Sequence, residues 1–234
     1  MISFLNTPLF QVSLTLVVFI TAKKLQIKYK SPLLNPILIT ILVVICFLLL
    51  SDIPYDDYKK NTMVISFWLA PSVIALGYAL YNFMEEIKSD VKRILLAMFL
   101  GSLTGIVSVV GIAFLFGASK LTIISLAPKS VTTPIAIEVS RHMGGIFSLT
   151  VAFVIVVGIF GAVFGHAFLK IIGVKKAKAV GLSLGASAHA LGTASISEKG
   201  PDYTAFGGLG MALNGIITAL IAPWVVQLML YFLY

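Results

Sequence analysis

The stretch Pro128–Gly145, PKSVTTPIAIEVSRHMGG, is the most informative part of this chain. It lies within an otherwise apolar sequence, yet it contains two prolines, a Ser/Thr cluster and four ionisable side chains. A second polar stretch, Gly185–Gly200 (GASAHALGTASISEKG), follows it. In the hydrocarbon of a membrane, broken backbone and ionisable groups are tolerated only where they are buried in protein or line a cavity. We therefore interpret the two polar stretches as the functional site and the remaining segments as their frame.

The composition is that of a membrane protein. Of the 234 residues, 59% are hydrophobic and 11% are charged, whereas a soluble domain has about 25% charged residues. The net charge of +8 would indicate nucleic-acid binding in a soluble protein, but the Lys and Arg residues of this chain gather in short loops. The positive-inside rule explains such loops, so we expect a lipid bilayer as a partner and no nucleic acid.

Intervals without charged residues locate the transmembrane segments. A bilayer crossing needs about 20 apolar residues, and each of these intervals has at least 21. The first interval has no basic residue before it and four Lys after it, which predicts a membrane helix with its N-terminus outside rather than a cleavable signal peptide. The sequence thus predicts an all-α polytopic membrane protein with six long transmembrane helices, at residues 1–22, 31–51, 61–84, 94–119, 143–169 and 203–234.

Loop charges predict the orientation and two hairpins. Residues 23–30, 85–93 and 170–178 carry four, three and four Lys or Arg, which places all three loops on the cytoplasmic side. The segment 118–146 must therefore leave and return on one face as a re-entrant helical hairpin, and 178–200 must do the same from the cytoplasmic face. The alternative is eight crossings with two broken helices, which would put 170–178 outside, against the charge rule.

A weak internal repeat relates the two hairpins. An offset of 57 residues places Ser130 on Ser187, with four further identities. One crossing per unit would invert the second copy, and inverted repeats with interrupted helices near the midplane are a common plan for secondary transporters. We therefore expect an inverted repeat within a transport part, residues 94–234, and a scaffold or oligomerisation part, residues 1–93. We also expect a homo-oligomer, with a dimer favoured.

Within the first stretch, Ser130-Val-Thr-Thr-Pro134 is typical of a helix start. Thr133 suits the N-cap and Pro134 the first helical position, where its missing N–H costs nothing. The free N–H groups of that turn and the positive end of the helix dipole bind anions, carboxylates included. Lys129 and the hydroxyls of Ser130, Thr132 and Thr133 would complete a substrate site, unless these hydroxyls only cap backbone in a buried break.

Two charged residues follow on the same predicted helix. Glu138 and Arg141 are three residues apart and therefore share a helix face. They form either a buried ion pair that keeps neighbouring elements in register or a site at which Glu138 carries a coupling proton, as intramembrane carboxylates often do. Both interpretations stay open at this point.

The second stretch consists mainly of small residues. Glycine and alanine allow two helix backbones to approach closely, as packing in membranes requires. Gly192 and Thr193 are predicted to break the helix and, together with Ser187, to offer amides or hydroxyls to a ligand. His189, the exception in an apolar run, is either a donor to a bound carboxylate or a satisfied core residue.

No catalytic arrangement is recognisable in the sequence. It has no nucleophile elbow, no phosphate-binding loop and no metal-ligand spacing among its three histidines and one cysteine. We therefore expect a protein that is not an enzyme, uses no cofactor or metal, and has a site that binds and releases a ligand.

The two stretches also resemble a known family. KSVTTPIAIEVSRHMGG, followed by GLSLGASAHALGTA and preceded by YKSPLLNP, is similar to sequences of the bacterial LrgB/CidB family, which extends to a chloroplast glycolate/glycerate translocator. The resemblance covers essentially the whole chain. It implies a multi-pass protein of the bacterial cytoplasmic membrane with a smaller LrgA/CidA-type membrane protein as its partner.

The resemblance implies two kinds of function. One is transport of small carboxylates such as pyruvate, glycolate or glycerate, which by position would involve Lys129–Glu138 and Ser187–Thr193. The other is that of a holin- or antiholin-like oligomer that modulates murein hydrolase activity and cell lysis. Simple holins have few helices and need no polar hairpins, so we favour a carboxylate transporter, with control of lysis as a consequence of its activity.

Overall fold

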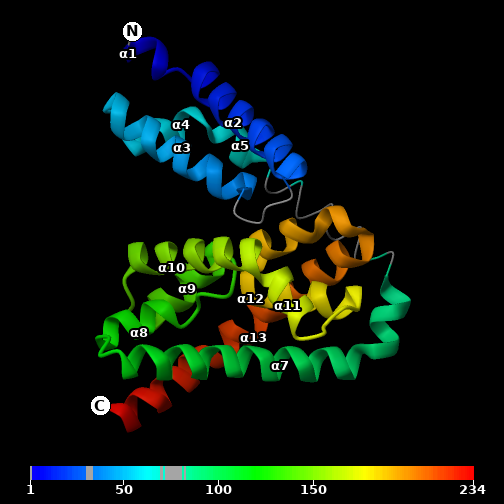
Figure 1. Ribbon diagram of the computed structural model, residues 1–234. Helices are drawn as coiled ribbons and strands as arrows, with labels where there is room; N and C mark the ends of the chain where they lie inside the picture. Colours follow the sequence, from blue (N-terminus) through cyan, green and yellow to red (C-terminus); the bar gives the residue numbers. More distant parts are fainter. Residues whose placement is uncertain (1, 30–33, 69–70, 72–80, 82) are drawn as a thin grey trace. The chain divides into compact units, whose positions relative to one another are not determined.

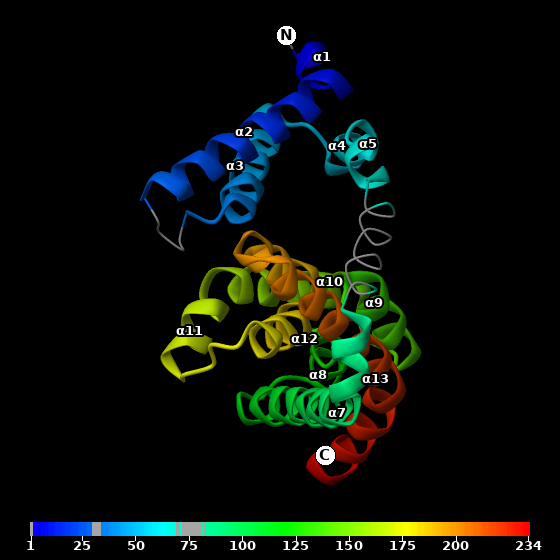
Figure 2. The ribbon, with the colours of Figure 1, turned by 90° about the vertical axis from the view of Figure 1, so that its right-hand side faces the viewer.

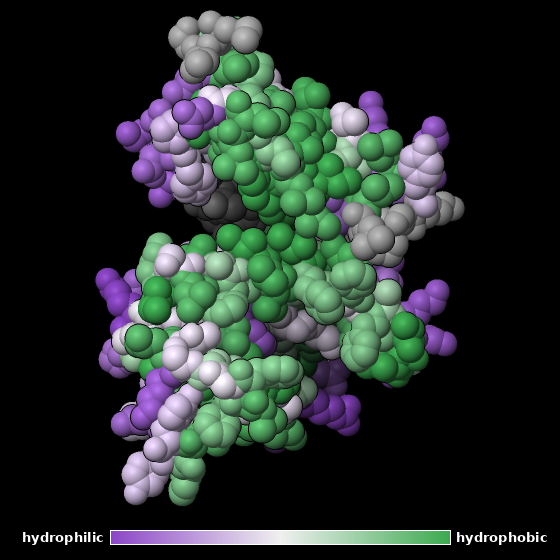
Figure 3. Space-filling view, turned by 60° about the vertical axis from the view of Figure 1, so that its left-hand side comes forward, coloured by the Kyte–Doolittle hydropathy of each residue, from purple (hydrophilic) through white to green (hydrophobic). Residues whose placement is uncertain are grey.

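The protein is all-helical, as the sequence predicts. The computed structural model describes residues 2–29, 34–68, 71, 81 and 83–234, and no strand occurs among these residues (Figure 1). Five of the described helices are long and apolar enough to cross a membrane. Their outward side chains are largely hydrophobic (Figure 3), which suits contact with lipid better than with water.

The chain divides into two compact units, Met1–Ala75 and Leu76–Tyr234. In the first unit, the rings of Phe10 and Phe47 lie 5.7 Å apart and join α2 to α3. Thr15 Oγ1 lies 2.8 Å from Tyr58 Oη and joins α2 to α4. The described helices of this unit are α1 (Ile2–Leu5), α2 (Pro8–Tyr29), α3 (Pro36–Ser51), α4 (Tyr55–Asn61) and α5 (Met63–Phe67).

The second unit contains the two polar stretches. Its elements are α7 (Met84–Leu115), α8 (Lys120–Leu126), α9 (Thr133–His142), α10 (Phe147–Phe160), a π-helical segment (Gly161–Gly165), α11 (His166–Ile171), α12 (Ala177–Ile196), a short 3₁₀ turn (Ser197–Lys199) and α13 (Pro201–Leu233) (Figures 1 and 2).

Four of the six expected spans correspond to long helical segments: α2, α7, α10 through α11, and α13. The expected span 31–51 contains α3, which has 16 described helical residues and is therefore shorter than the roughly 20 that a perpendicular crossing requires. Half of the expected span 61–84 lies outside the described residues.

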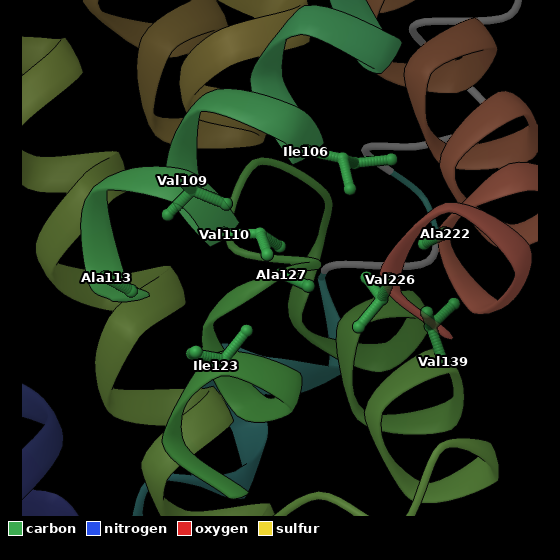
Figure 4. Packing of buried hydrophobic residues seen from close by; sticks show 9 residues of the cluster. All are labelled: Ile106, Val109, Val110, Ala113, Ile123, Ala127, Val139, Ala222 and Val226. Atoms are coloured by element: carbon green, nitrogen blue, oxygen red, sulfur yellow. The ribbon is translucent and has the colours of Figure 1, made fainter. Parts of the chain in front are cut away.

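The long helices α7 and α13 form a parallel frame. Met98 of α7 belongs to the same core cluster as Phe206 of α13. One turn further along α7, Ser102 Oγ donates a hydrogen bond to Asn214 Oδ1 of α13 at 2.6 Å. Because residue numbers increase together along both helices, the two run in the same direction. A larger core cluster continues this contact and adds α8 and α9; it consists of Ile106, Val109, Val110, Ala113, Ile123, Ala127, Val139, Ala222 and Val226 (Figure 4).

The first polar stretch is a helical hairpin made by α8, a loop and α9. The exit packs against the first arm, because Ile146 N donates a hydrogen bond to Ser125 Oγ, in the last turn of α8, at 2.8 Å. The entrance is at the C-terminal end of α13, where Tyr234 Oη donates to the carbonyl of Ala118 at 2.5 Å. The tip reaches the middle of α13. This confirms the predicted hairpin for 118–146.

The second polar stretch, α12, is also a hairpin, because its helix is broken at Ala188 (φ −132°, ψ 18°) and His189 (φ 44°, ψ −134°). Residues eight positions apart in a continuous helix are about 12 Å apart. Here Gly192 instead lies against the carbonyl of Leu184, on the other arm. The two arms are therefore folded back on each other.

The position of this break differs from the one expected at Gly192 and Thr193. Both residues are helical, and the reversal lies four residues earlier. Gly192 serves instead as a site of close approach between the arms, because a side chain there would collide with Leu184 and with Ala188 Cβ. A glycine that permits close packing and a glycine that breaks a helix look the same in a sequence.

The hairpins enter from opposite ends of α13, and their tips meet at its middle. The first arm of α12 runs parallel to α13, because Gly181 lies against Tyr203 and the carbonyl of Ala186 accepts a hydrogen bond from Asn214 Nδ2 at 2.8 Å. The hairpin of α8 and α9 enters from the other end, and the carbonyl of Ser130 accepts from the same Asn214 amide at 3.3 Å.

The helices that follow the hairpins make reciprocal contacts. Gly158 of α10 lies against His189 at the second tip, and Gly215 of α13 lies against Ile135 beside the first tip. Gly158 and Gly215 are equivalent under the offset of 57 residues. Each repeat within the second unit thus consists of a hairpin and the helix that follows it. The second repeat is inverted relative to the first, which is the predicted inverted repeat.

An ion pair decides whether residues 118–146 and 178–200 are hairpins or cross the membrane. Lys178 Nζ lies 3.6 Å from Asp90 Oδ2, so the loop 170–178 and the segment 85–93 lie at the same end of the second unit. Eight crossings would have separated these segments by the thickness of the membrane. The arrangement is therefore the one with two hairpins.

We expect residues 28 and 175 to share the cytoplasmic side, because the Lys/Arg excess around both holds them there. In a Cys46→Ala background, Lys28→Cys and Lys175→Cys should both resist an impermeant thiol reagent added to intact cells. Lys120→Cys, at the opposite end of the second unit, is the control that should react. Labelling at residue 175 but not at residue 28 would show that the predicted orientation is wrong.

Candidate functional site

A cavity of about 350 Å³ lies where the two hairpin tips meet the middle of α7 and α13. Four elements line it, and most of its polar groups are hydroxyls. The polar and glycine residues of the lining are Gly101, Ser102 and Gly105 from α7, Lys129 and Ser130 from the first tip, Ser183 and Ser187 from α12, and Asn214 and Thr218 from α13. The cavity is thus a mainly uncharged pocket between inverted hairpins.

Lys129 is the one ionisable residue of this lining. Its Nζ donates a hydrogen bond to Ser130 Oγ at 3.1 Å, and no carboxylate among the described residues forms an ion pair with it. The side chain is half-buried. Removing an ammonium group from water without an anionic partner is unfavourable, so an anion bound in the cavity would stabilise this arrangement.

Asn214 holds the site together. Its side chain is buried, with an exposed fraction of 2%. The amide nitrogen donates to the carbonyls of Ser130 and Ala186, one on each hairpin, and the amide oxygen accepts hydrogen bonds from Ser102 Oγ at 2.6 Å and Thr218 Oγ1 at 3.4 Å. One carboxamide therefore joins α7, α13 and both tips.

Asn214→Leu should lower the free energy of unfolding by about 2 kcal/mol, because hydrogen bonds between membrane helices contribute roughly 0.6 kcal/mol each and buried partners left unpaired add to the loss. The measurement is thermal or SDS-induced unfolding of the purified protein. Thr218→Val, on the same helix and in the same cavity, removes only the 3.4 Å bond and should change stability little. Equal stability of the two variants would contradict the linking role of Asn214.

The structure brings together three of the residues that the sequence predicts as substrate-binding. Lys129 and Ser130 lie at the first tip and Ser187 lies just before the second, and all three line the cavity. Ser130 and Ser187 are the residues related by the offset of 57. The predicted meeting of the two stretches is thus observed at these positions.

The start of α9 differs by one residue from the expectation. Thr132, not Thr133, is the N-cap, Thr133 is the first helical residue, and no side chain caps the helix. Pro134 is exposed. Thr132, Thr133 and Pro134 lie next to the tip but do not belong to the cavity lining, so direct contact of these residues with a ligand stays a prediction.

His189, Gly192 and Thr193 shape the second hairpin. His189 Nε2 lies 3.1 Å from the carbonyl of Val154, and Thr193 Oγ1 donates to the carbonyl of His189 at 3.0 Å. All three residues are buried and none lines the cavity. Their contact with substrate also stays a prediction, whereas their packing role is evident from these distances.

Glu138 and Arg141 form the predicted ion pair, with Arg141 Nη2 2.6 Å from Glu138 Oε2. The expectation that the pair is buried is wrong, because the side chains of Arg141 and Glu138 are 75% and 63% exposed. The opposite face of α9, with Ala136 and Val139, packs into the core instead. The pair lies outside the cavity lining.

Sequence reasoning missed Ser102, Ser183, Asn214 and Thr218. Asn214 carried a usable signal, because a carboxamide within an uncharged apolar span needs a partner inside the protein. The three hydroxyl residues carried none, since a serine or threonine in a membrane helix can donate to its own backbone and so does not require a partner elsewhere.

The fold and the site define the class of protein. It is a polytopic helical membrane protein in which two inverted hairpin–helix units enclose a small polar cavity. The chain belongs to the LrgB-like family, whose model matches residues 15–228, and this confirms the resemblance noted above.

Several relatives cover nearly the whole chain. An uncharacterized protein of Haemophilus influenzae is 37% identical over 94% of this chain and 95% of its own length. The holin-like protein CidB of Staphylococcus epidermidis is 37% identical over 92% of this chain and 94% of its own length. The holin-like protein CidB of Staphylococcus aureus is also 37% identical, over 94% of this chain and 96% of its own length. No solved structure matches the chain significantly.

Proposed function

We propose that this protein transports small carboxylates of the pyruvate, glycolate or glycerate type across the bacterial cytoplasmic membrane. The observation that carries the proposal is Lys129, a half-buried ammonium group without a carboxylate partner among the described residues, at the meeting point of two inverted hairpins. A site between inverted repeats near the membrane midplane becomes accessible first from one side and then from the other when one repeat rocks against the other.

The remaining lining supports a small, oxygen-rich ligand. A cavity of about 350 Å³ suits a molecule of a few heavy atoms rather than a large cofactor. Lys129 would bind the carboxylate, and hydroxyls such as those of Ser130 and Ser187 would bond a hydroxyl or keto oxygen beside it. A purely apolar ligand of the same size would leave the Lys129 ammonium group without an anionic partner.

A second candidate function comes from the relatives named holin-like protein CidB. In that case the chain would act as a holin- or antiholin-like oligomer that regulates membrane permeability and cell lysis without a transport cycle. A small LrgA/CidA-type membrane protein is a proposed partner in either case. We further propose a homodimer held by residues 1–93, an N-terminus outside, and altered lysis as a consequence of transport.

Uptake into liposomes separates the two functions. The purified chain is reconstituted, and entry of labelled pyruvate, glycolate and acetate is followed with and without a pH gradient. We expect saturable uptake that unlabelled carboxylates compete with and that leaves a trapped neutral sugar inside. Leakage of the sugar together with the carboxylates would favour the holin-like function and contradict the transporter.

Glu138→Gln should leave the pH dependence of uptake unchanged, because Glu138 is exposed, is paired with Arg141 and lies outside the cavity lining. An exposed ion pair also adds little to stability, so the thermal midpoint should hardly change. Arg141→Gln is the matched control and should behave in the same way. Loss of pH dependence in Glu138→Gln alone would instead assign the coupling proton to this carboxylate.

A further inference from the structure

The second unit has another hollow, an apolar groove between α10–α11 and the first arm of α12. Its volume is about 630 Å³. Phe160, Phe164 and Phe168 form one wall, since residues four apart lie on the same helix face, and the rings of Phe160 and Phe164 are 4.9 Å apart. Val157 and Leu184 add to the apolar lining.

This groove meets the polar cavity. Lys129, Ser183 and Ser187 line both hollows, so these three residues form the junction between them. Lys129 is the one ionisable residue in either lining. A cation with two hydroxyls at one end and an aromatic wall beyond is the chemistry of a site for an anionic head with an apolar tail.

We infer that the site binds monocarboxylates with an alkyl chain, with the carboxylate at Lys129 and the chain along the groove walled by Phe160, Phe164 and Phe168. This inference rests on the proposed function, because it uses the same carboxylate position. It widens the substrate class from two- and three-carbon acids to short straight-chain fatty acids. It also predicts discrimination against dicarboxylates, whose second carboxylate would lie against phenyl rings with no cation beside it.

The test is displacement of labelled pyruvate from the purified full-length protein by acetate, butyrate and hexanoate. Each buried methylene should lower the inhibitory concentration about fourfold, so hexanoate should compete far better than acetate, and succinate no better than acetate. Val157→Phe fills the groove at a residue that does not belong to the lining of the polar cavity, and it should abolish the gain with chain length, so that butyrate and hexanoate compete no better than acetate.

Two further variants keep this result interpretable. Val156→Phe is the matched control, because Val156 is a neighbouring residue with 62% of its surface exposed and no part in the groove lining; it should keep the gain. If Val157→Phe does not fold, Phe160→Ala, which shortens the wall at an exposed position, should reduce the gain severalfold.

The outcomes separate the two levels of the proposal. If acetate, butyrate and hexanoate displace pyruvate from the wild-type protein at equal concentrations, the inference about the groove is wrong, and the proposed carboxylate transport is unaffected. An unchanged slope in Val157→Phe also overturns the groove, because the gain then reflects partition into detergent. Failure of every carboxylate to bind, pyruvate included, removes the proposed function and this inference together.

Discussion

Replacing Lys129 with Gln should lower pyruvate uptake by reconstituted protein about 10- to 100-fold. The variant shortens the side chain by one atom and keeps a nitrogen that can donate to Ser130, but it removes the charge. A charge-assisted hydrogen bond contributes about 1.5–3 kcal/mol, and 1.4 kcal/mol corresponds to a factor of ten. Because Lys129 is the one ionisable residue that the described part of the chain contributes to the cavity lining, no other described side chain of that lining can replace its charge.

The matched control is Lys120→Gln. Lys120 belongs to the same hairpin, but it is exposed and its Nζ lies 4.7 Å from the centre of the Tyr234 ring, at the hairpin entrance. Its loss should leave uptake within about twofold of the wild type, since exposed charges far from a site act only weakly on it. Lys129→Arg should retain more uptake than Lys129→Gln. Equal uptake by Lys129→Gln and wild type would place the carboxylate site elsewhere.

Gly185→Ala should destabilise the protein by about 3 kcal/mol, the upper part of the range for an added group in a packed interior. A Cβ at this position would collide with the carbonyl of Gly207 and lie 2.9 Å from the backbone nitrogen of Met211. Backbone atoms cannot move aside as the end of a flexible side chain can. The variant should therefore push the first arm of α12 away from α13 and lower the thermal midpoint of unfolding.

Gly111→Ala is the control for this variant. Gly111 lies in α7, and a Cβ there would meet nothing within 4 Å, so alanine should be neutral or slightly stabilising because it favours the helix. Both variants are purified, and their unfolding and pyruvate uptake are compared. If Gly185→Ala unfolds at the wild-type temperature, the close approach of α12 and α13 does not carry the stability assigned to it.

The two hairpins were predictable from the charges of the loops alone. The Lys/Arg counts of 85–93 and 170–178 required both loops on one side, which left room only for hairpins at the two polar stretches. The ion pair of Asp90 with Lys178 agrees with this reasoning. It succeeded because membrane insertion responds to charge and hydrophobicity, which are local properties of the chain.

The site was predictable only in part. Lys129, Ser130 and Ser187 were identified because polar groups are conspicuous in an apolar chain, and all three line the cavity. The break in α12 was placed at Gly192 and Thr193 but lies at Ala188 and His189. The break depends on contacts of both arms with α13, which the local sequence does not contain.

The sequence by itself determined the class of protein, the positions of most long helices, the two hairpins and their inversion. These follow from hydrophobic length, loop charge and an internal offset, all of which are read along the chain. Only the tertiary structure decided which polar groups face the cavity. Asn214 bonds Ser102, 112 positions away, and Ser130, 84 positions away, and such pairings depend on how helices pack, which no local pattern encodes.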